Sequence, residues 1–221
     1  MYYAIIVAGG SGSRMGSETP KQFMTVAGLP VLMHTIGAFY HSRLRPEILV
    51  VLNKDYFNYW QELCGRHGFS IPHLLVEGGG ERYHSVKNAL NRITDKNAVV
   101  AIHDAVRPAV SGELITRSFL EAAEKGSSVC GIPSRDSVRL LKEGTSTALN
   151  RQHIFLIQTP QTFQFKILKS AYELPYKSEF TDDASVVEAS GFNIHLTTGE
   201  PGNIKITYPG DINIVESLLK T

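Results

Sequence analysis

Glycines and two cations follow the first apolar segment of the chain, in an arrangement that suits a phosphate group. The segment Ala4 to Ala8 is uniformly apolar, and Arg14 and Lys21 lie shortly after it. Between and around them stand Gly9, Gly10, Gly12 and Gly16. Glycines let backbone amides approach a large anion, and the two cations add full positive charge. The stretch therefore predicts a phosphate-binding loop.

The spacing of this loop excludes the two commonest glycine-rich phosphate motifs. A dinucleotide fingerprint starting at Gly10 would need glycine where Met15 stands, and the Gly-Lys pair of a P-loop is absent. The remaining pattern, G-G-S-G-S-R-M-G followed by Pro20-Lys21-Gln22, resembles the signature loop of nucleotidyltransferases that join a nucleoside triphosphate to a phosphorylated sugar or polyol. A plain glycine turn between a strand and a helix is the alternative.

Two further polar clusters follow predicted strands. Gly78-Gly79-Gly80-Glu81-Arg82 comes directly after the predicted strand His73 to Glu77, and Asp104 and Arg107 come after Ala98 to His103. Open α/β sheets bind ligands at the carboxyl ends of their strands, so these clusters are expected at one edge. Asp104 suits Mg²⁺, which prefers carboxylate and phosphate oxygens. The alternative is that Asp104 and Arg107 only pair with each other across a turn.

Three more side chains are candidates with strong structural alternatives. Ser85 lies one residue off the buried stripe of its predicted helix and could face a ligand. Thr181 precedes two acids and is predicted to cap a helix that ends at Gly191, a purely structural arrangement. Lys205 alternates with Ile204 and Ile206 in a predicted strand and points away from the core, as a solvated lysine would.

The elements that must position these residues alternate between strand and helix. Apolar runs predict strands, and apolar residues at helical spacing predict helices. The predicted strands are 4–8, 47–52, 73–77, 98–103, 128–133 and 203–207, and the predicted helices are 31–41, 55–68 with Asp55 as N-cap, one around Val86 to Ile93, 113–125 after Ser111, 181–191 and 211–219. This order predicts a mostly parallel sheet built from β-α-β units and flanked by helices, with residues 4–8 as the central strand.

Residues 134–152 form a more polar and less periodic stretch than their surroundings. We expect two short strands that meet in a hairpin and extend from the body as a β-arm at about 134–157. Such an arm has few core residues and is rarely stable alone, so it is expected to pack on a second copy of the chain. With 221 residues and 43% apolar composition, the chain is expected to form a single domain over 1–221.

The composition excludes several classes of partner. A net charge of +1 does not provide the basic surface that nucleic-acid binding usually needs. No apolar run approaches the roughly 18 residues of a membrane span, and no signal-type segment precedes the first strand. Two widely separated cysteines, Cys64 and Cys130, suggest packed thiols in a reducing compartment. These features predict a cytoplasmic protein without nucleic-acid or membrane partners.

Taken together, six motifs resemble one family. AGGSGSRMG with PKQ, GGGERYHSV, HDAVRP, QTPQTF, TDDAS and NIKIT occur in the order and spacing of the 2-C-methyl-D-erythritol 4-phosphate cytidylyltransferases of the non-mevalonate isoprenoid pathway. The resemblance covers the chain from Ala4 to about Leu219. It implies a Rossmann-like nucleotidyltransferase domain, a homodimer held by the β-arm, and transfer of CMP from CTP to the 4-phosphate of methylerythritol with release of pyrophosphate in the presence of Mg²⁺.

The resemblance also implies a role for each matching position. Arg14, Lys21 and Lys205 would be catalytic, and Asp104 would hold Mg²⁺. The CTP-binding positions would be Ala8, Gly9, Gly10, Gly12, Gly79, Ser85 and Ala105. The polyol phosphate would be bound by Arg107, Thr181 and Lys205, and by Ser137 and Arg151 from the arm of the second copy.

Several positions depart from the family pattern. The family often has alanine at Gly9, an acidic residue at Gly80, threonine at Ser137 and lysine at Arg139. A ribitol-5-phosphate cytidylyltransferase shares the AGG and HDAVRP forms and is an alternative, although TDDAS and the Asn150-Arg151 pair favour methylerythritol. A non-catalytic nucleotide-binding protein is a further alternative, opposed by the full set of cations.

Overall fold

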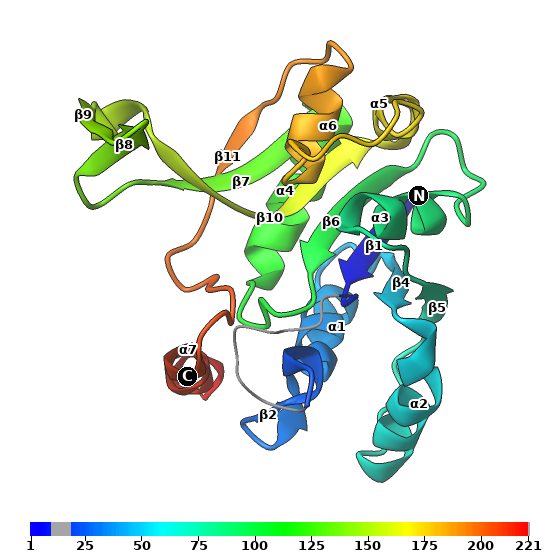
Figure 1. Cartoon of the computed structure of the whole chain (residues 1–221). Coiled ribbons are helices and arrows are strands. Elements are labelled where there is room, and N and C mark those ends of the chain that lie inside the picture. Colours follow the sequence, from blue (N-terminus) through cyan, green and yellow to red (C-terminus); the bar gives the residue numbers. More distant parts are fainter. Residues whose placement is uncertain (10–18, 221) are drawn as a thin grey trace.

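A computed structural model of the chain describes residues 1–9 and 19–220. Its body is a seven-stranded sheet with helices on both faces (Figure 1). In spatial order the strands are β11 (Leu196–Thr198), β7 (Ser127–Pro133), β10 (Phe155–Gln164), β6 (Val99–Asp104), β1 (Tyr2–Val7), β4 (Glu47–Leu52) and β5 (Leu74–Glu77). All neighbouring pairs are parallel except those of β10, which runs against β6 and β7. The predicted α/β fold with a mostly parallel sheet is confirmed.

The prediction that the first strand is central was wrong by one position. Strand β6 occupies the middle of the sheet, and β1 lies beside it, between β6 and β4. Both strands are buried on two faces, so both give uninterrupted apolar runs, and composition cannot rank them.

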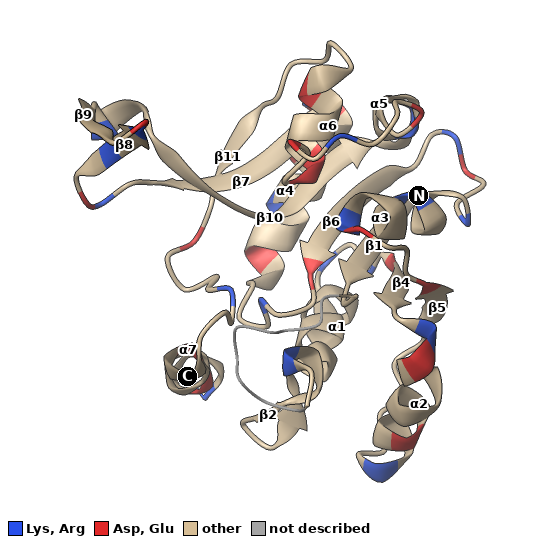
Figure 2. Ribbon diagram, in the orientation of Figure 1, with Lys and Arg blue, Asp and Glu red and all other residues tan. Residues whose placement is uncertain are grey.

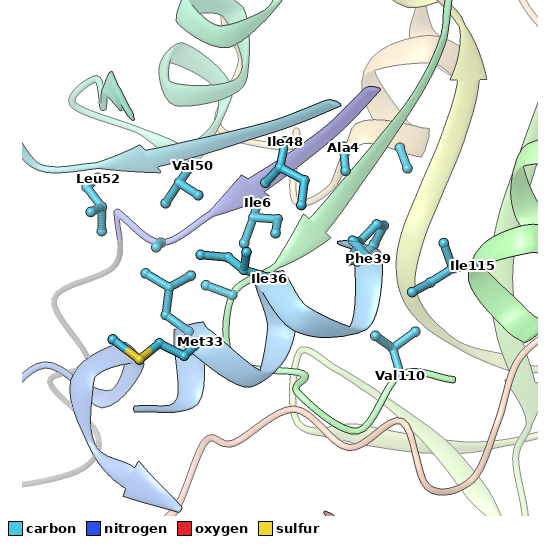
Figure 3. Close-up of a cluster of buried hydrophobic side chains, with 14 of the residues drawn as sticks. Ala4, Ile6, Met33, Ile36, Phe39, Ile48, Val50, Leu52, Val110 and Ile115 are labelled. Atoms are coloured by element: carbon cyan, nitrogen blue, oxygen red, sulfur yellow. The ribbon is translucent and has the colours of Figure 1, made fainter. Parts of the chain in front are cut away.

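Helices cover the two faces of the sheet. One face packs against α1 (Val31–His41), α2 (Phe57–Arg66) and α4 (Gly112–Lys125), and the other against α3 (Arg82–Leu90), α5 (Phe165–Ala171) and α6 (Asp183–Ala189). Figure 3 shows the first of these layers, in which Ile36 and Phe39 of α1 lie under Ile6 of β1. Burial of such side chains is worth about 25 cal/mol per Å² and holds the strand ends in fixed positions.

The C-terminal helix α7 (Pro209–Leu219) packs separately from these layers. Val215 of α7 forms a small apolar cluster with Val26, Val31, Val106 and Ile206. Val26 belongs to a short ladder of β2 (Thr25–Val26) and β3 (Leu29–Pro30) that follows the turn η2 (Lys21–Phe23). The cluster therefore joins the segments that carry Lys21 and Lys205 to the loop after β6.

Several helix starts differ from the predictions. Asp182, not Thr181, caps α6 by accepting the Ser185 amide, because its carboxylate lies one residue nearer the first turn. The predicted helix 55–68 begins as a short turn, η3 (Lys54–Tyr56), capped by Asn53 and not by Asp55. Ser111 caps α4 as predicted.

The predicted strand 203–207 is absent, and an irregular segment takes its place. The period-two pattern does not appear in the burial either, because Asn203 and Ile206 are the buried residues and Ile204 and Lys205 are both partly exposed. Within the described part of the chain, the segment bonds the backbone of another element through the amide of Ile206, at Val106, and no ladder forms.

Residues 138–149 form an antiparallel hairpin of β8 (Val138–Lys142) and β9 (Thr145–Leu149) that stands away from the body (Figure 1). Its two-residue turn, Glu143-Gly144, has positive φ at both positions, which a type I′ turn requires and which glycine tolerates. Leu140 and Leu141 are 51% and 72% exposed on it. A third turn, η4 (Arg151–His153), leads back into β10.

Among residues 1–9 and 19–220, none of the helices is long and apolar enough to cross a bilayer.

Candidate active site

Asp104, the last residue of β6, is the centre of a cluster of charges at the carboxyl ends of the strands. Its Oδ2 accepts from Lys205 Nζ at 3.0 Å and from Arg107 Nε at 3.2 Å. Burial acts to raise the pKa of Asp104, but the charges of Lys205, Arg82 and Arg107 outweigh it and hold that pKa well below its ordinary value. Asp104 is therefore ionised at any working pH.

Lys21 lies on the same side of the molecule as Asp104. Its Nζ donates to the carbonyl of Ile206 at 3.0 Å, one residue from Lys205. Figure 2 shows lysine and arginine segments from distant parts of the chain gathering around the acidic end of β6. The sequence predicted this convergence of cations from three separate motifs.

The ion pair of Asp104 and Arg107 was an alternative to a functional role, and it does form. The pair is part of a larger arrangement, because Arg107 also donates through Nη1 to the carbonyl of Asn203 at 2.8 Å. Lys205, which a solvated position would have left free, bonds the same carboxylate. The pair thus helps to assemble the cluster.

His103, the residue before Asp104 in β6, fixes the turn between Asp104 and Arg107 by hydrogen bonds. It is fully buried and bonds the Arg107 carbonyl through Nε2 and the Thr159 hydroxyl through Nδ1, both at 3.1 Å. Burial lowers the pKa of His103 to about 4, so the ring is neutral and holds the turn without adding charge. The sequence indicates no functional role for His103, and in the structure it holds the turn after β6.

The predicted nucleotide positions lie around the ends of β1 and β5. Ser85 is buried and accepts from the amide of Gly79 at 3.0 Å, so its hydroxyl orders the glycine loop, and its role toward a ligand stays a prediction. A side chain at Gly79 would lie 2.3 Å from Cβ of His84, which explains glycine there. A Cβ on Gly9 would lie 3.6 Å from Ser85 Oγ, so the first and second glycine segments meet at this hydroxyl.

Ala8 and Ala105 are buried and directly follow the neighbouring strands β1 and β6. The amide of Ala8 is bonded to Val51, and its carbonyl accepts from Gln22 at 2.8 Å. The amide of Ala105 is bonded to Val7. The predicted residues Gly10, Gly12, Arg14 and Gly16 lie outside the described residues.

The remaining acceptor-site candidates are not joined to the cluster by contacts. Thr181 is exposed on the loop before α6, and the neighbouring Asp182 anchors that loop to Gln161 of β10 at 2.9 Å. Ser137 and Arg151 are exposed at the base of the hairpin, where Arg151 bonds the carbonyl of Arg135. The hairpin itself projects from the body (Figure 1).

The structure also identifies a buried ion pair that the sequence analysis missed. Arg82 of the second glycine motif donates to Asp183 at 2.6 Å, and Tyr172 donates to the other oxygen of that carboxylate at 2.6 Å. Arg82 and Asp183 both lie inside motifs quoted above, but they are 101 positions apart, so no local pattern indicates their pairing. The pair joins α3 to α6.

Among the described residues, cations clustered around one carboxylate at the carboxyl ends of the strands fit a nucleotidyltransferase. Comparison with known proteins gives the family: the model for 2-C-methyl-D-erythritol 4-phosphate cytidylyltransferase matches residues 2–221. The chain belongs to this family.

Similar proteins agree over the whole length. The enzyme of that name from Bacteroides fragilis is 48% identical over 216 residues, which covers 98% of each chain. The one from Porphyromonas gingivalis is 44% identical, covering 98% of this chain and 97% of that one. The crystal structure of 4-diphosphocytidyl-2C-methyl-D-erythritol synthase from Anaerococcus prevotii superposes with a TM-score of 0.84 at 27% identity, covering 100% of this chain and 96% of that one.

Proposed function

We propose that this chain transfers CMP from CTP to the phosphate of 2-C-methyl-D-erythritol 4-phosphate, giving 4-diphosphocytidyl-2-C-methyl-D-erythritol and pyrophosphate for isoprenoid precursor synthesis. The single observation that carries the proposal is the convergence of Lys205 and Arg107 on Asp104, with Lys21 held one residue away. The similarity to enzymes of this name supports it. The ribitol phosphate alternative is not favoured, since the relatives named here carry the methylerythritol name.

The reaction needs no nucleophile from the protein. An oxygen of the acceptor phosphate forms a bond to the α-phosphorus of CTP, and the bond from that phosphorus to the bridging oxygen breaks as pyrophosphate leaves. The main barriers are repulsion between two polyanions and the loss of freedom in aligning them. Lys21, together with Arg14, would neutralise charge on the α-phosphoryl oxygens and the leaving group.

The nucleotide would lie across the two glycine segments. The backbones of Ala8, Gly9 and Ala105 would frame the cytidine, and the loop that Ser85 orders at Gly79 would close around it. Gly10 and Gly12 would add amides toward the phosphates.

The residues at Asp104 fit a magnesium ion that would take a carboxylate from the protein and further oxygen ligands from the substrate phosphates. Among the described residues, no group of three His, Cys, Asp or Glu could hold a metal alone, but Mg²⁺ commonly takes one carboxylate together with substrate phosphates. Asp104 is the ionised carboxylate at the strand ends. When bound there, the ion would neutralise negative charge on the triphosphate.

The acceptor phosphate would lie on the other side of Asp104. Arg107 and Lys205 would bind it, and Thr181 would contribute a hydroxyl from its exposed position. Ser137 and Arg151 would reach it from the hairpin of a second copy, since both are exposed beside a hairpin that projects from the body.

The hairpin would hold a homodimer. Leu140 and Leu141 are exposed on the hairpin, and Leu156 and Ile157 at the start of β10 are 52% and 39% exposed, so apolar surface is open at both places. A surface of this kind marks a protein contact. Residues 1–221 would act as one catalytic unit.

Its two cysteines are free thiols, and free thiols suit the reducing environment of the cytoplasm.

Pyrophosphate release tests the activity. The protein is given CTP and Mg²⁺ with methylerythritol 4-phosphate or ribitol 5-phosphate in separate reactions, and release with the former alone is expected. Lys21→Met should lower kcat about a hundredfold, because one well-placed donor to a developing charge is worth about 3 kcal/mol. Lys54→Met, at an exposed lysine of η3, is the matched control. No release with either acceptor would refute the function.

Mixing two inactive variants tests the shared site. Lys21→Met inactivates the body of one chain, and Arg151→Ala inactivates the arm of the other. If sites are shared, random exchange should restore about a quarter of the wild-type sites, since half of the dimers are mixed and each regains one site. A fully active monomer in sedimentation would overturn the arm's role.

A further inference from the structure

The segment that carries Lys205 is held in place mainly by side chains. We name residues 199–207, between β11 and α7, the strap. Its backbone-to-backbone hydrogen bonds with other elements of the described chain are made at Gly199, which donates to Gly131 at 2.8 Å, and at Ile206, which donates to Val106 at 2.9 Å. A lysine on an irregular segment reaches a fixed point only if that segment is anchored nearby.

Gln158 provides this anchor from the interruption in β10. The ladder of β10 with β7 shifts register between Ile157 and Gln161, so Gln158 lies in an irregular stretch. Its side chain accepts from the amide of Glu200 at 3.1 Å and donates to the carbonyl of the same residue at 2.8 Å. The primary amide thus bonds both backbone groups of one strap residue, as a strand would.

The fit of Gln158 against the strap is close. The side chain is only 6% exposed, and a Cβ on Gly199 would lie 2.3 Å from Gln158 Oε1. The same amide nitrogen also lies 3.4 Å from the carbonyl of Asn203, which Arg107 bonds at 2.8 Å. Gln158 therefore contacts the strap on both sides of the turn that leads to Lys205.

Glu200 is also held through its own side chain. Its carboxylate accepts from the hydroxyl and the amide of Ser111, the N-cap of α4. The strap is consequently attached to both β10 and α4 at one residue, five positions before Lys205.

We propose that Gln158 is a positioning residue, whose two bonds to Glu200 set the place from which Lys205 reaches Asp104 and the acceptor phosphate. This inference rests on the proposed function, which assigns Lys205 to that phosphate. Without these bonds the strap keeps its contacts with Gly131, Ser111 and Val106 but loses the two that fix the Glu200 backbone. A displacement of about 1 Å at a substrate-binding group can cost about a hundredfold in rate. The glycine segments lie elsewhere, and the strap residue that Lys21 bonds, Ile206, is held separately through its amide to Val106, so the nucleotide elements should keep their geometry.

A double-mutant cycle on kcat/KM for the acceptor tests the proposal. The variants are Gln158→Leu, Lys205→Met and the two combined, and Gln164→Leu is the matched control. Gln164 stands on the same strand and donates a similar bond at 3.0 Å, but to Ala123 of α4 and not to the strap. Thermal unfolding and CTP affinity by calorimetry are measured for each variant.

We expect Gln158→Leu to lower kcat/KM for the acceptor about thirtyfold, with CTP affinity within about twofold of wild type. The double variant should be no slower than Lys205→Met alone, because Gln158 acts through that lysine. Gln164→Leu should stay within about twofold. If Gln158→Leu does not fold, Gln158→Glu replaces it, since it keeps the acceptor and loses the donors.

Two outcomes overturn the inference. Losses that multiply in the double variant would show that Gln158 does not act through Lys205. An unchanged kcat/KM in Gln158→Leu would show that it positions nothing. Full activity of Lys205→Met is a separate result, because it removes the lysine's role in the proposed function and this inference with it.

Discussion

The buried ion pair of Arg82 and Asp183 gives the sharpest test of how this fold is stabilised. Asp183 is 0% exposed and Arg82 is 29% exposed, and their atoms are 2.6 Å apart. Arg82→Met keeps most of the side chain's volume and removes its charge. The carboxylate of Asp183 then remains buried, with the Tyr172 hydroxyl as its remaining side-chain partner among those described here.

The expected loss of stability follows from that burial. Removing one partner of a buried pair costs about 3 to 5 kcal/mol, and we take the lower end because water can partly reach the Arg82 position. Adding Asp183→Asn to Arg82→Met should recover about 1 kcal/mol, since a neutral amide is less costly to bury than an unpaired charge.

The same substitution elsewhere in the chain is the control. Arg66 pairs with Glu62 at 3.1 Å, but these side chains are 61% and 63% exposed. An exposed pair is worth about 0.5 kcal/mol or less, so Arg66→Met should be nearly silent. The two pairs have the same chemistry and differ in burial.

Urea unfolding followed by far-UV circular dichroism measures both variants. With a slope of about 2 to 3 kcal/mol per M, Arg82→Met should lower the midpoint by about 1 M, at an unchanged slope. Arg66→Met should shift it by about 0.2 M or less. Equal shifts for the two variants would refute the argument that burial decides the value of the pair.

Two further predictions concern the glycine loop and the cysteines. Gly79→Ala should raise KM for CTP about tenfold, because the added Cβ would meet His84. Gly80→Ala places its Cβ in open space and should leave KM unchanged, so equal effects of the two variants in steady-state kinetics would contradict this prediction. Burial raises the pKa of Cys130 to about 12, so at pH 8 it is a thiol and should resist iodoacetamide in the native protein. Cys64 is partly exposed and should be alkylated first, as peptide mass spectrometry would show.

The elements that sequence predicted best are those with a local signal. Helix α1 and strand β4 have the predicted bounds, since apolar periodicity and flanking breakers are contained in each segment. The order of β6 and β1 within the sheet was not predictable, because two doubly buried strands have the same composition. The absence of a strand at 203–207 depends on whether a neighbouring backbone is available, which no local pattern reports.

The same distinction holds for the site. Asp104 and Arg107 were predicted because they follow an apolar run that ends at one edge of the sheet, whereas Lys205 was named only through the family resemblance. The bonds of Gln158 to Glu200 were missed, since they join a side chain to backbone 42 positions away. The bond of the Ser85 hydroxyl to the Gly79 amide was missed, because helical spacing gives a face but not the partner that fills it.

The abrupt burial of β10 determines where this chain can change in length. The strand leaves the hairpin, is exposed over Phe155 to Ile157, and becomes buried at Gln158 without a loop between. Removing one residue there would turn every later side chain of the strand to the other face. The Glu143-Gly144 tip, in contrast, can lengthen without disturbing anything behind it. Insertions among relatives should gather at the tip and spare the root.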